Sequence, residues 1–251
     1  MQQSNTYIII FSIALTIVLG GLLSIAAIGL KPFQTKAIEF DTKRSILSSV
    51  VTMDENVDIE GLYASRVRSF VVNIEGEQVE TDEEGKPLIP NKISIEKQYK
   101  KDPANRLLPV YTFMNESDST KVDAYIFPLY GNGLWDKIWG YMAVGPDLNT
   151  VKGFSMDHKG ETPGLGARIT SAEVQQRYVG KELFDDSGNL VGIEMVKGER
   201  GDPSLFGPHK VDGMSGATLT ANGVNDMILK YIGYYQSFID KLKESSTVAL
   251  N

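Results

Sequence analysis

The chain has 251 residues, of which 25 are Lys or Arg and 32 are Asp or Glu, giving a formal net charge of −7. Residues 1–30 contain none of these charged residues, so the sequence excludes both a polytopic membrane protein and a wholly soluble one. The acidic excess argues against nucleic-acid binding, because Lys and Arg neutralise phosphates. The lack of Cys excludes disulfides and bound iron–sulfur clusters, and two histidines, His158 and His209, leave little room for a metal site.

The first predicted element is a membrane anchor, residues 1–30, with a helix over about residues 7–30. Tyr7–Leu30 contains no ionisable side chain. A helix of that length spans roughly 36 Å, enough for a hydrocarbon core of about 30 Å. A cleaved signal peptide is less favoured, since no basic residue precedes the apolar segment and that segment is long for a signal. Without intramembrane charges, the helix is expected to anchor rather than to conduct ions.

The orientation of this anchor is not settled by charge. The basic residues Lys31, Lys36, Lys43 and Arg44 follow the helix and none precedes it. The positive-inside rule alone would place the body of the chain in the cytoplasm. Only six residues precede the helix, however, and large domains can be translocated against such a bias.

The body is predicted to be an α+β domain, residues 56–251, joined to the anchor by a juxtamembrane helical linker, residues 31–55. Apolar residues over 36–51 indicate an amphipathic helix. Further helices are predicted over 171–178 and 219–243, the second with a long apolar stripe. The predicted strands, separated by Gly, Pro and Asn or Asp clusters, are 70–74, 108–113, 124–129, 138–144, 151–156 and 190–196. We expect a mixed or antiparallel sheet with packed helices.

Three stretches are rich in Gly, Pro and hydroxyl residues beyond what turns require: residues 128–135 (PLYGNGLW), 158–166 (HKGETPGLG) and 212–220 (DGMSGATLT). None of them matches a phosphate-binding Walker loop, a dinucleotide fingerprint or a nucleophile elbow. The sequence therefore offers no familiar nucleotide-binding or hydrolase motif.

The third stretch lies directly before the long predicted helix. Its small residues allow close approach of a ligand to the backbone, and Ser215 and Thr218 place hydroxyl groups where free N–H groups favour an anion. This pattern suits a phosphate group and a hydroxyl that could be esterified. The alternative is that Ser215 or Thr218 only caps the helix, which is common for these residue types.

Asp212-Gly213-Met214-Ser215-Gly216-Ala217-Thr218 fits the flavinylation motif Dxx(S/T)GA(T/S), and in this respect the chain resembles the FMN-binding domain family. With the other two stretches and the anchor, the whole chain resembles the NqrC family, the C subunits of sodium-translocating NADH:quinone reductases. The G subunits of the Rnf electron-transport complex share the anchor and similar motifs but are usually shorter. The long segment over 56–102 favours the NqrC family.

The resemblance implies a set of FMN contacts. Thr218 would carry FMN as a phosphoester, transferred from FAD by a flavin transferase. The remaining expected contacts fall into three groups: Ser215, Gly216 and Ala217 at the phosphate; Glu161, Thr162, Gly164, Leu165 and Gly166 in a loop along the flavin; and Leu134 and Trp135 beside the isoalloxazine ring. From the residues alone, a core aromatic is a serious alternative for Trp135, and an ordinary turn is an equally reasonable one for residues 161–164.

The resemblance also implies a role and a location. The chain would be an electron-transfer subunit that receives electrons from an iron–sulfur centre on partner subunits and delivers them to another flavin-bearing subunit, binding neither NADH nor quinone itself. Its body would lie on the outer, periplasmic face of the bacterial inner membrane, where the flavin transferase works. An alternative of another class is an anchored, non-redox binding or scaffold domain; the intact acceptor motif argues against it.

Overall fold

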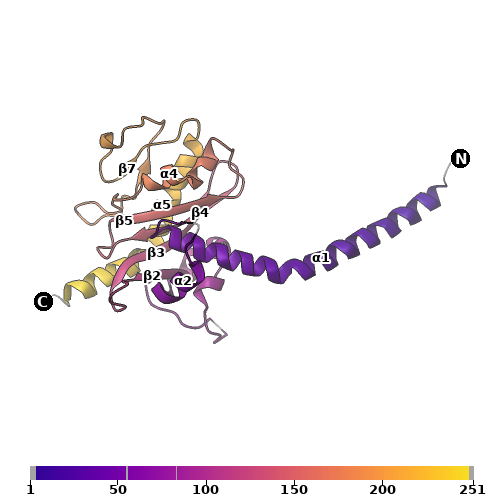
Figure 1. Cartoon of the computed structure of the whole chain (residues 1–251), viewed down its shortest axis with the longest axis horizontal. Coiled ribbons are helices and arrows are strands. Elements are labelled where there is room, and N and C mark those ends of the chain that lie inside the picture. Colours follow the sequence, from indigo (N-terminus) through magenta and orange to yellow (C-terminus); the bar gives the residue numbers. More distant parts are fainter. Residues whose placement is uncertain (1–3, 55, 83, 249–251) are drawn as a thin grey trace. The chain divides into compact units, whose positions relative to one another are not determined.

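The computed structural model describes residues 4–54, 56–82 and 84–248 (Figure 1). The chain divides into two compact units, with the division between Thr42 and Lys43. From Asn5 onward the first unit is part of a single helix, and the second unit contains the sheet and the remaining helices of the described residues.

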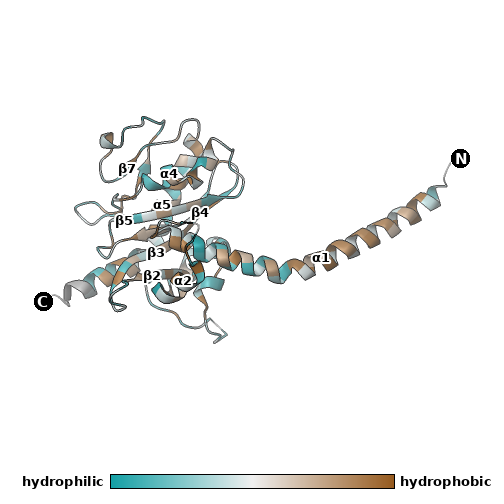
Figure 2. Ribbon diagram, viewed as in Figure 1, coloured by the Kyte–Doolittle hydropathy of each residue, from teal (hydrophilic) through white to brown (hydrophobic). Residues whose placement is uncertain are grey.

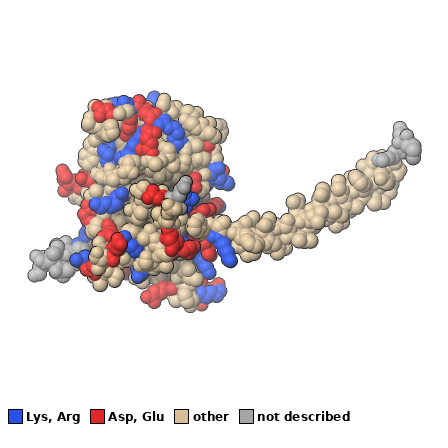
Figure 3. Space-filling view, viewed as in Figure 1, with Lys and Arg blue, Asp and Glu red and all other residues tan. Residues whose placement is uncertain are grey.

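The N-terminal unit consists of most of one long helix, α1, Asn5–Ser48. Its apolar residues continue along the helix, as the brown colouring in Figure 2 shows, and Figure 3 shows no charged side chain along its first part. In the described residues, α1 is the one helix that is long and apolar enough to cross a membrane, with a mean hydropathy of 2.7 in its most apolar window. The predicted anchor helix and linker helix are therefore parts of one helix that contains Pro32. The domain boundaries at residues 30 and 55 stay predictions.

The last residues of α1 belong to the folded unit. Ile46 and Leu47 are fully buried and pack with Phe113, Ile126 and other residues of the sheet. The backbone that follows the helix lies directly on strand β5, because a Cβ atom at Gly153 would come within 2.1 Å of the Ser49 carbonyl oxygen. This end of α1 is thus fixed to the sheet by close packing.

The folded unit is built on a five-stranded antiparallel sheet in the order β1-β2-β3-β4-β5. The strands are β1 Val67–Val72, β2 Leu108–Met114, β3 Val122–Asn132, β4 Lys137–Val144 and β5 Val151–His158. The prediction of strands in these regions is confirmed. The strand predicted over 190–196 is wrong except for β6, Glu194–Met195, which pairs in parallel with β7, Lys210–Val211. The reason is that Gly192 has a φ of 68°, which interrupts extended backbone.

The longest helix of the folded unit is α5, Thr218–Val248, which packs on one face of the sheet. Its apolar stripe, including Val224, Ile228 and Tyr235, is fully buried in the main core. Alternate residues of the strands contribute to a second, smaller core on the other face, with helix α2 and the end of α1.

The remaining helices are α2 Ile59–Arg66, α3 Ile95–Tyr99 and α4 Ala172–Gln176, with four short 3₁₀ turns at Pro90–Lys92, Pro103–Asn105, Gly166–Thr170 and Pro203–Leu205. The predicted α+β fold is confirmed.

Candidate functional site

The first two Gly-rich stretches meet at the turn between β3 and β4. Trp135 lies in this turn, and its backbone N–H donates to Glu161 Oε1 at 2.9 Å. Its indole Nε1 donates to Thr162 Oγ1 at 3.2 Å. The turn is therefore held against the loop that follows β5 by one backbone and one side-chain hydrogen bond.

The third stretch joins the other two through the same carboxylate. Thr220, in the first turn of α5, donates its hydroxyl to Glu161 Oε2 at 2.6 Å, and both residues are buried. Gly133 and Gly166 leave the space that Glu161 occupies, since a Cβ atom at either position would lie within 2.5 Å of its carboxylate oxygens. The three stretches, distant in the sequence, thus converge on Glu161, and each of its two carboxylate oxygens accepts a hydrogen bond.

Thr218 is the first residue of α5, and the preceding residue, Ala217, has no side chain that could cap the helix. In the part of the chain that the structure describes, the N–H groups of Thr218, Leu219 and Thr220 have no acceptor, and the Thr218 hydroxyl has no partner. The first turn contains no acidic residue. Free N–H groups and the positive end of the helix dipole suit an anion. The alternative that Ser215 or Thr218 caps this helix is not supported by a hydrogen bond among the described residues.

Residues 212–216, which Ala217 separates from α5 and which belong to the motif that resembles a flavin-acceptor sequence, are called the acceptor loop. Gly216 has a φ of 73°, which favours glycine, and a Cβ atom there would lie 2.8 Å from Leu165 Cδ2. The acceptor loop and the loop after β5 are therefore in contact at Gly216 and Leu165. Gly164, also with a positive φ, lies at an open position of the same loop.

Four large apolar side chains are exposed on these segments and together form the apolar rim: Leu134, Trp135, Leu165 and Leu219. Trp135 is the most exposed of the four, at 70%. The alternative that Trp135 is a core aromatic is therefore wrong. Exposed apolar side chains beside free N–H groups suit a ligand with a planar apolar ring and an anionic tail.

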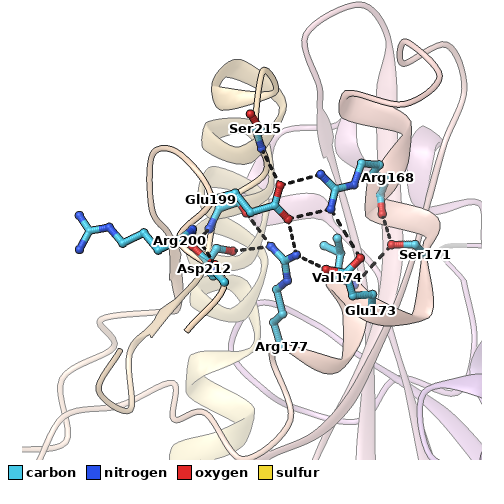
Figure 4. Close-up of polar contacts among 11 residues, drawn as sticks. Arg168, Ser171, Glu173, Val174, Arg177, Glu199, Arg200, Asp212 and Ser215 are labelled. Carbon is cyan, nitrogen blue, oxygen red and sulfur yellow. Dashed lines mark hydrogen bonds and ion pairs between the residues drawn. The ribbon is translucent and has the colours of Figure 1, made fainter. Parts of the chain in front are cut away.

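Figure 4 shows a charged cluster that holds the acceptor loop from the side and that sequence reasoning missed. Glu199 lies between Arg168 and Arg177, and it also accepts the Ser215 N–H at 3.3 Å. Hydrogen bonds from Arg168, and then from Arg177, hold the pKa of Glu199 well below its usual range. These residues are separated by many positions and share no motif, so the sequence carried no signal for their contact.

The structure places every predicted site residue on the three segments that meet at Glu161. Trp135, Leu134, Leu165, Thr162 and Gly164 lie at exposed positions; Ser215 and Gly216 are exposed in the acceptor loop; Thr218 is partly buried; and Ala217, Glu161 and Gly166 are buried. Their contacts with a cofactor stay predictions. Glu161 was predicted to lie along the flavin, but its carboxylate bonds to Thr220 and to the β3–β4 turn, so it joins segments of the protein to one another.

Known proteins resemble the chain over nearly its whole length. The C subunit of Na(+)-translocating NADH-quinone reductase from Neisseria meningitidis serogroup A is 34% identical, over 96% of this chain and 95% of that protein. The protein of the same name from Pseudomonas aeruginosa is 30% identical, over 97% of this chain and 98% of its own. The chain belongs to the NqrC family, the C subunits of Na(+)-translocating NADH-quinone reductases. The resemblance inferred from the motifs is confirmed.

Solved structures of the NqrC family share the fold. The crystal structure of the C subunit from Parabacteroides distasonis is 30% identical and gives a TM-score of 0.69, covering 84% of this chain and 96% of that one. The crystal structure of Shewanella oneidensis NqrC gives a TM-score of 0.67 at 30% identity, covering 83% and 99% of the two chains. Most of the chain thus shares its fold with these solved structures.

Residues 133–233 match the model of the FMN-binding domain. This range contains the β3–β4 turn, the loop after β5, the acceptor loop and the start of α5. The residues present fit FMN on two structural grounds: the uncapped start of α5 offers N–H groups to a phosphate, and the apolar rim offers surface to a ring system.

Proposed function

We propose that the chain is the FMN-carrying electron-transfer subunit of a sodium-translocating NADH-quinone reductase complex. Membership of the NqrC family and the match of residues 133–233 to the FMN-binding domain support this role. The single structural observation that carries it is the uncapped start of α5 beside the apolar rim. FMN supplies one- and two-electron redox chemistry when bound.

Thr218 is the residue to which FMN is attached in this proposal. The Thr218 Oγ forms a bond to the FMN phosphorus of FAD, the bond from that phosphorus to the AMP oxygen breaks, AMP leaves, and the hydroxyl proton passes to solvent. A flavin transferase assists the step. The free hydroxyl of Thr218 supports this assignment, because no existing hydrogen bond of that hydroxyl has to break before it can attack the phosphorus.

The residues around Thr218 have separate tasks in this proposal. The N–H groups at the start of α5 hold the phosphodiester, whose single negative charge is stabilised there by about 0.3–1 kcal/mol. That energy is too small to retain a cofactor, so the covalent bond to Thr218 retains it. Leu134, Trp135 and Leu165 orient the ring and exclude water from one side of it, and Ser215, Gly216 and Ala217 shape the backbone beside the phosphate.

The location and partners follow from this role. The α1 helix anchors the chain in the bacterial inner membrane, and the folded unit lies on the outer face, where the flavin transferase works. There the chain receives electrons from an iron–sulfur centre on one partner and delivers them to a flavin-bearing partner. This orientation opposes the charge bias of Lys31, Lys36, Lys43 and Arg44.

One experiment tests both the attachment site and the orientation. The full-length wild type, Thr218→Val and Thr170→Val are each coexpressed with a flavin transferase that is either exported or retained in the cytoplasm. Thr170 is the matched control because it is an exposed threonine outside the site. With exported transferase, the wild type and Thr170→Val show flavin fluorescence in a denaturing gel and gain the mass of one FMN less one water, and Thr218→Val shows neither.

Two outcomes contradict the proposal. Equal fluorescence of Thr218→Val and the wild type would refute Thr218 as the attachment site. Fluorescence of the wild type only with the retained transferase would place the folded unit on the cytoplasmic side.

A further inference from the structure

The acceptor loop is anchored at its beginning and exposed at its end. Asp212 is buried, and its carboxylate accepts the N–H groups of Arg200, Gly201 and Gly213 at 2.6–3.0 Å. Ser215 and Gly216, three and four residues later, are exposed. The exposed end, next to Thr218, therefore needs a second support if its conformation is to be fixed.

Glu199 provides a contact at that exposed end. Its two oxygens accept both terminal nitrogens of Arg168, at 2.8 and 2.7 Å, in a bidentate pair. Oε1 also accepts from Arg177 at 2.7 Å, and Oε2 accepts the Ser215 N–H at 3.3 Å. Bidentate guanidinium–carboxylate pairs fix orientation as well as distance. Arg168 and Arg177 thus hold the carboxylate of Glu199 in place against the acceptor loop.

Arg177 holds the same loop through its carbonyl groups. Its Nη1 donates to the carbonyl oxygens of Asp212 at 3.2 Å and Gly213 at 2.5 Å. The acceptor loop is consequently contacted on its N–H side by Glu199 and on its carbonyl side by Arg177, and these two residues are themselves paired (Figure 4).

Glu173 forms ordinary ion pairs with the same two arginines and can therefore be compared with Glu199. Glu173 also contacts both Arg168 and Arg177, but no contact joins its side chain to the acceptor loop among the residues that the structure describes. Its side chain is 67% exposed, whereas that of Glu199 is 21% exposed. Glu173 and Glu199 therefore share their cationic partners and differ in the contact with Ser215.

We propose that Glu199 is a positioning residue for flavin attachment, which sets the conformation of the acceptor loop through Arg168, Arg177 and the Ser215 N–H and so presents the Thr218 hydroxyl to the flavin transferase. The inference rests on the proposed function of Thr218. Glu199 contacts neither Thr218 nor the flavin in this scheme, and it acts through the backbone between Ser215 and Thr218.

The test compares Glu199→Gln with Glu173→Gln in the full-length chain, using purified flavin transferase and FAD. The initial rate of flavin incorporation is measured by in-gel fluorescence at a temperature at which each variant is fully folded. Glu199→Gln removes the negative charge and one of the two oxygens that accept from Arg168 and Arg177, so the side chain is held less firmly against Ser215. We expect this substitution to slow incorporation by about tenfold. Glu173→Gln is expected to remain within about twofold of the wild type.

Amide hydrogen exchange supplies a readout that a general loss of stability would not reproduce. In Glu199→Gln, exchange is expected to speed up in the peptide containing Ser215 while the core strands remain protected. In Glu173→Gln, exchange of that peptide stays as in the wild type. If Glu199→Gln does not fold, Glu199→Asp replaces it: its shorter side chain keeps the charge but cannot reach both arginines and Ser215, and slower incorporation is expected.

The outcomes separate this inference from the proposed function. Rates of Glu199→Gln or Glu199→Asp equal to that of Glu173→Gln, in folded protein, overturn the role of Glu199. Incorporation into Thr218→Val at the wild-type rate overturns the proposed attachment site. It also overturns the role of Glu199, because that role rests on attachment at Thr218.

Discussion

The two sides of the candidate site are held in different ways. On one side, the acceptor loop is fixed by Asp212, Glu199 and Arg177 through hydrogen bonds to its backbone. On the other side, the apolar rim exposes Trp135 and Leu165, and a single hydrogen bond joins the Trp135 indole to Thr162. The side where a covalent bond would form is held through several hydrogen bonds to its backbone, whereas the side that would contact a ring exposes large apolar side chains.

Because of this difference, substitutions in the acceptor loop should destabilise the fold, whereas substitutions at the apolar rim should affect only the environment of the cofactor. Changes that disturb the acceptor loop break partly buried hydrogen bonds to its backbone or its close packing, and either loss lowers stability. Changes at the apolar rim remove exposed side chains, which costs little. Substitutions on the two sides should therefore differ in the size of their effect on stability.

The largest effect on stability is expected from Gly213→Ala in the acceptor loop. A Cβ atom at Gly213 would lie 1.9 Å from the Val196 carbonyl oxygen and 2.2 Å from that of Gly198. Because both neighbours are backbone atoms, the chain must shift, and we expect a loss of about 3 kcal/mol in the free energy of unfolding, measured by urea denaturation. Gly207→Ala is the control, since nothing lies within 4 Å of a Cβ atom there. Equal stability of the two variants would show that the acceptor loop is not tightly packed.

A smaller, pH-dependent effect is expected at Glu199. Its pKa in the folded chain lies below the ordinary value, chiefly because of its bonds to Arg168, so its contribution to stability is present above the unfolded pKa of about 4.3 and is lost as the pH falls further. At pH 7, Glu199→Gln is expected to be about 2 kcal/mol less stable than the wild type. The difference should shrink as the pH falls below about 4.

Urea denaturation over a range of pH measures this difference. Glu116→Gln is the control, because Glu116 is 86% exposed and lies 3.8 Å from Arg66, and it should match the wild type throughout. A gap between wild type and Glu199→Gln that stays constant from about pH 7 to about pH 3 would contradict the ionised state assigned to Glu199.

The smallest effect on stability is expected from Trp135→Ala at the apolar rim. The side chain is 70% exposed, so the free energy of unfolding should change by less than about 0.5 kcal/mol. Flavin emission from the loaded protein should change, however, because the ring would lose its neighbour. Leu205→Ala, exposed outside the site, should alter neither quantity. Unchanged flavin emission in Trp135→Ala would place the ring elsewhere.

The sequence predicted the parts of this molecule that depend on local patterns. Short runs of β-forming residues bounded by Gly, Pro and Asn or Asp clusters predicted the regions of β1–β5, and the apolar stripe of residues 219–243 predicted most of α5. The motif ending at Thr218 marked the start of α5, because small and hydroxyl residues before a helix leave its N–H groups accessible.

The parts that depend on distant contacts could not be predicted. Nothing near Glu161 in the sequence indicates that its carboxylate accepts from Trp135 and Thr220, and nothing near Glu199 indicates two arginine partners. The strand predicted over 190–196 failed because a run of β-forming residues did not reveal the positive φ of Gly192. The short helices α2 and α3 were missed because they are too short to show a clear periodicity.

The convergence of three distant segments on Glu161 has a consequence for the order of events during maturation. An unfolded chain contains the same residues from Asp212 to Thr218, but it lacks the helix start, the contact of Leu165 with Gly216 and the buried carboxylate that join the segments. The acceptor exists as a shaped site only after the sheet and α5 have assembled. Attachment of the cofactor would then follow folding, and a chain that carries it would be one whose tertiary structure had already been completed.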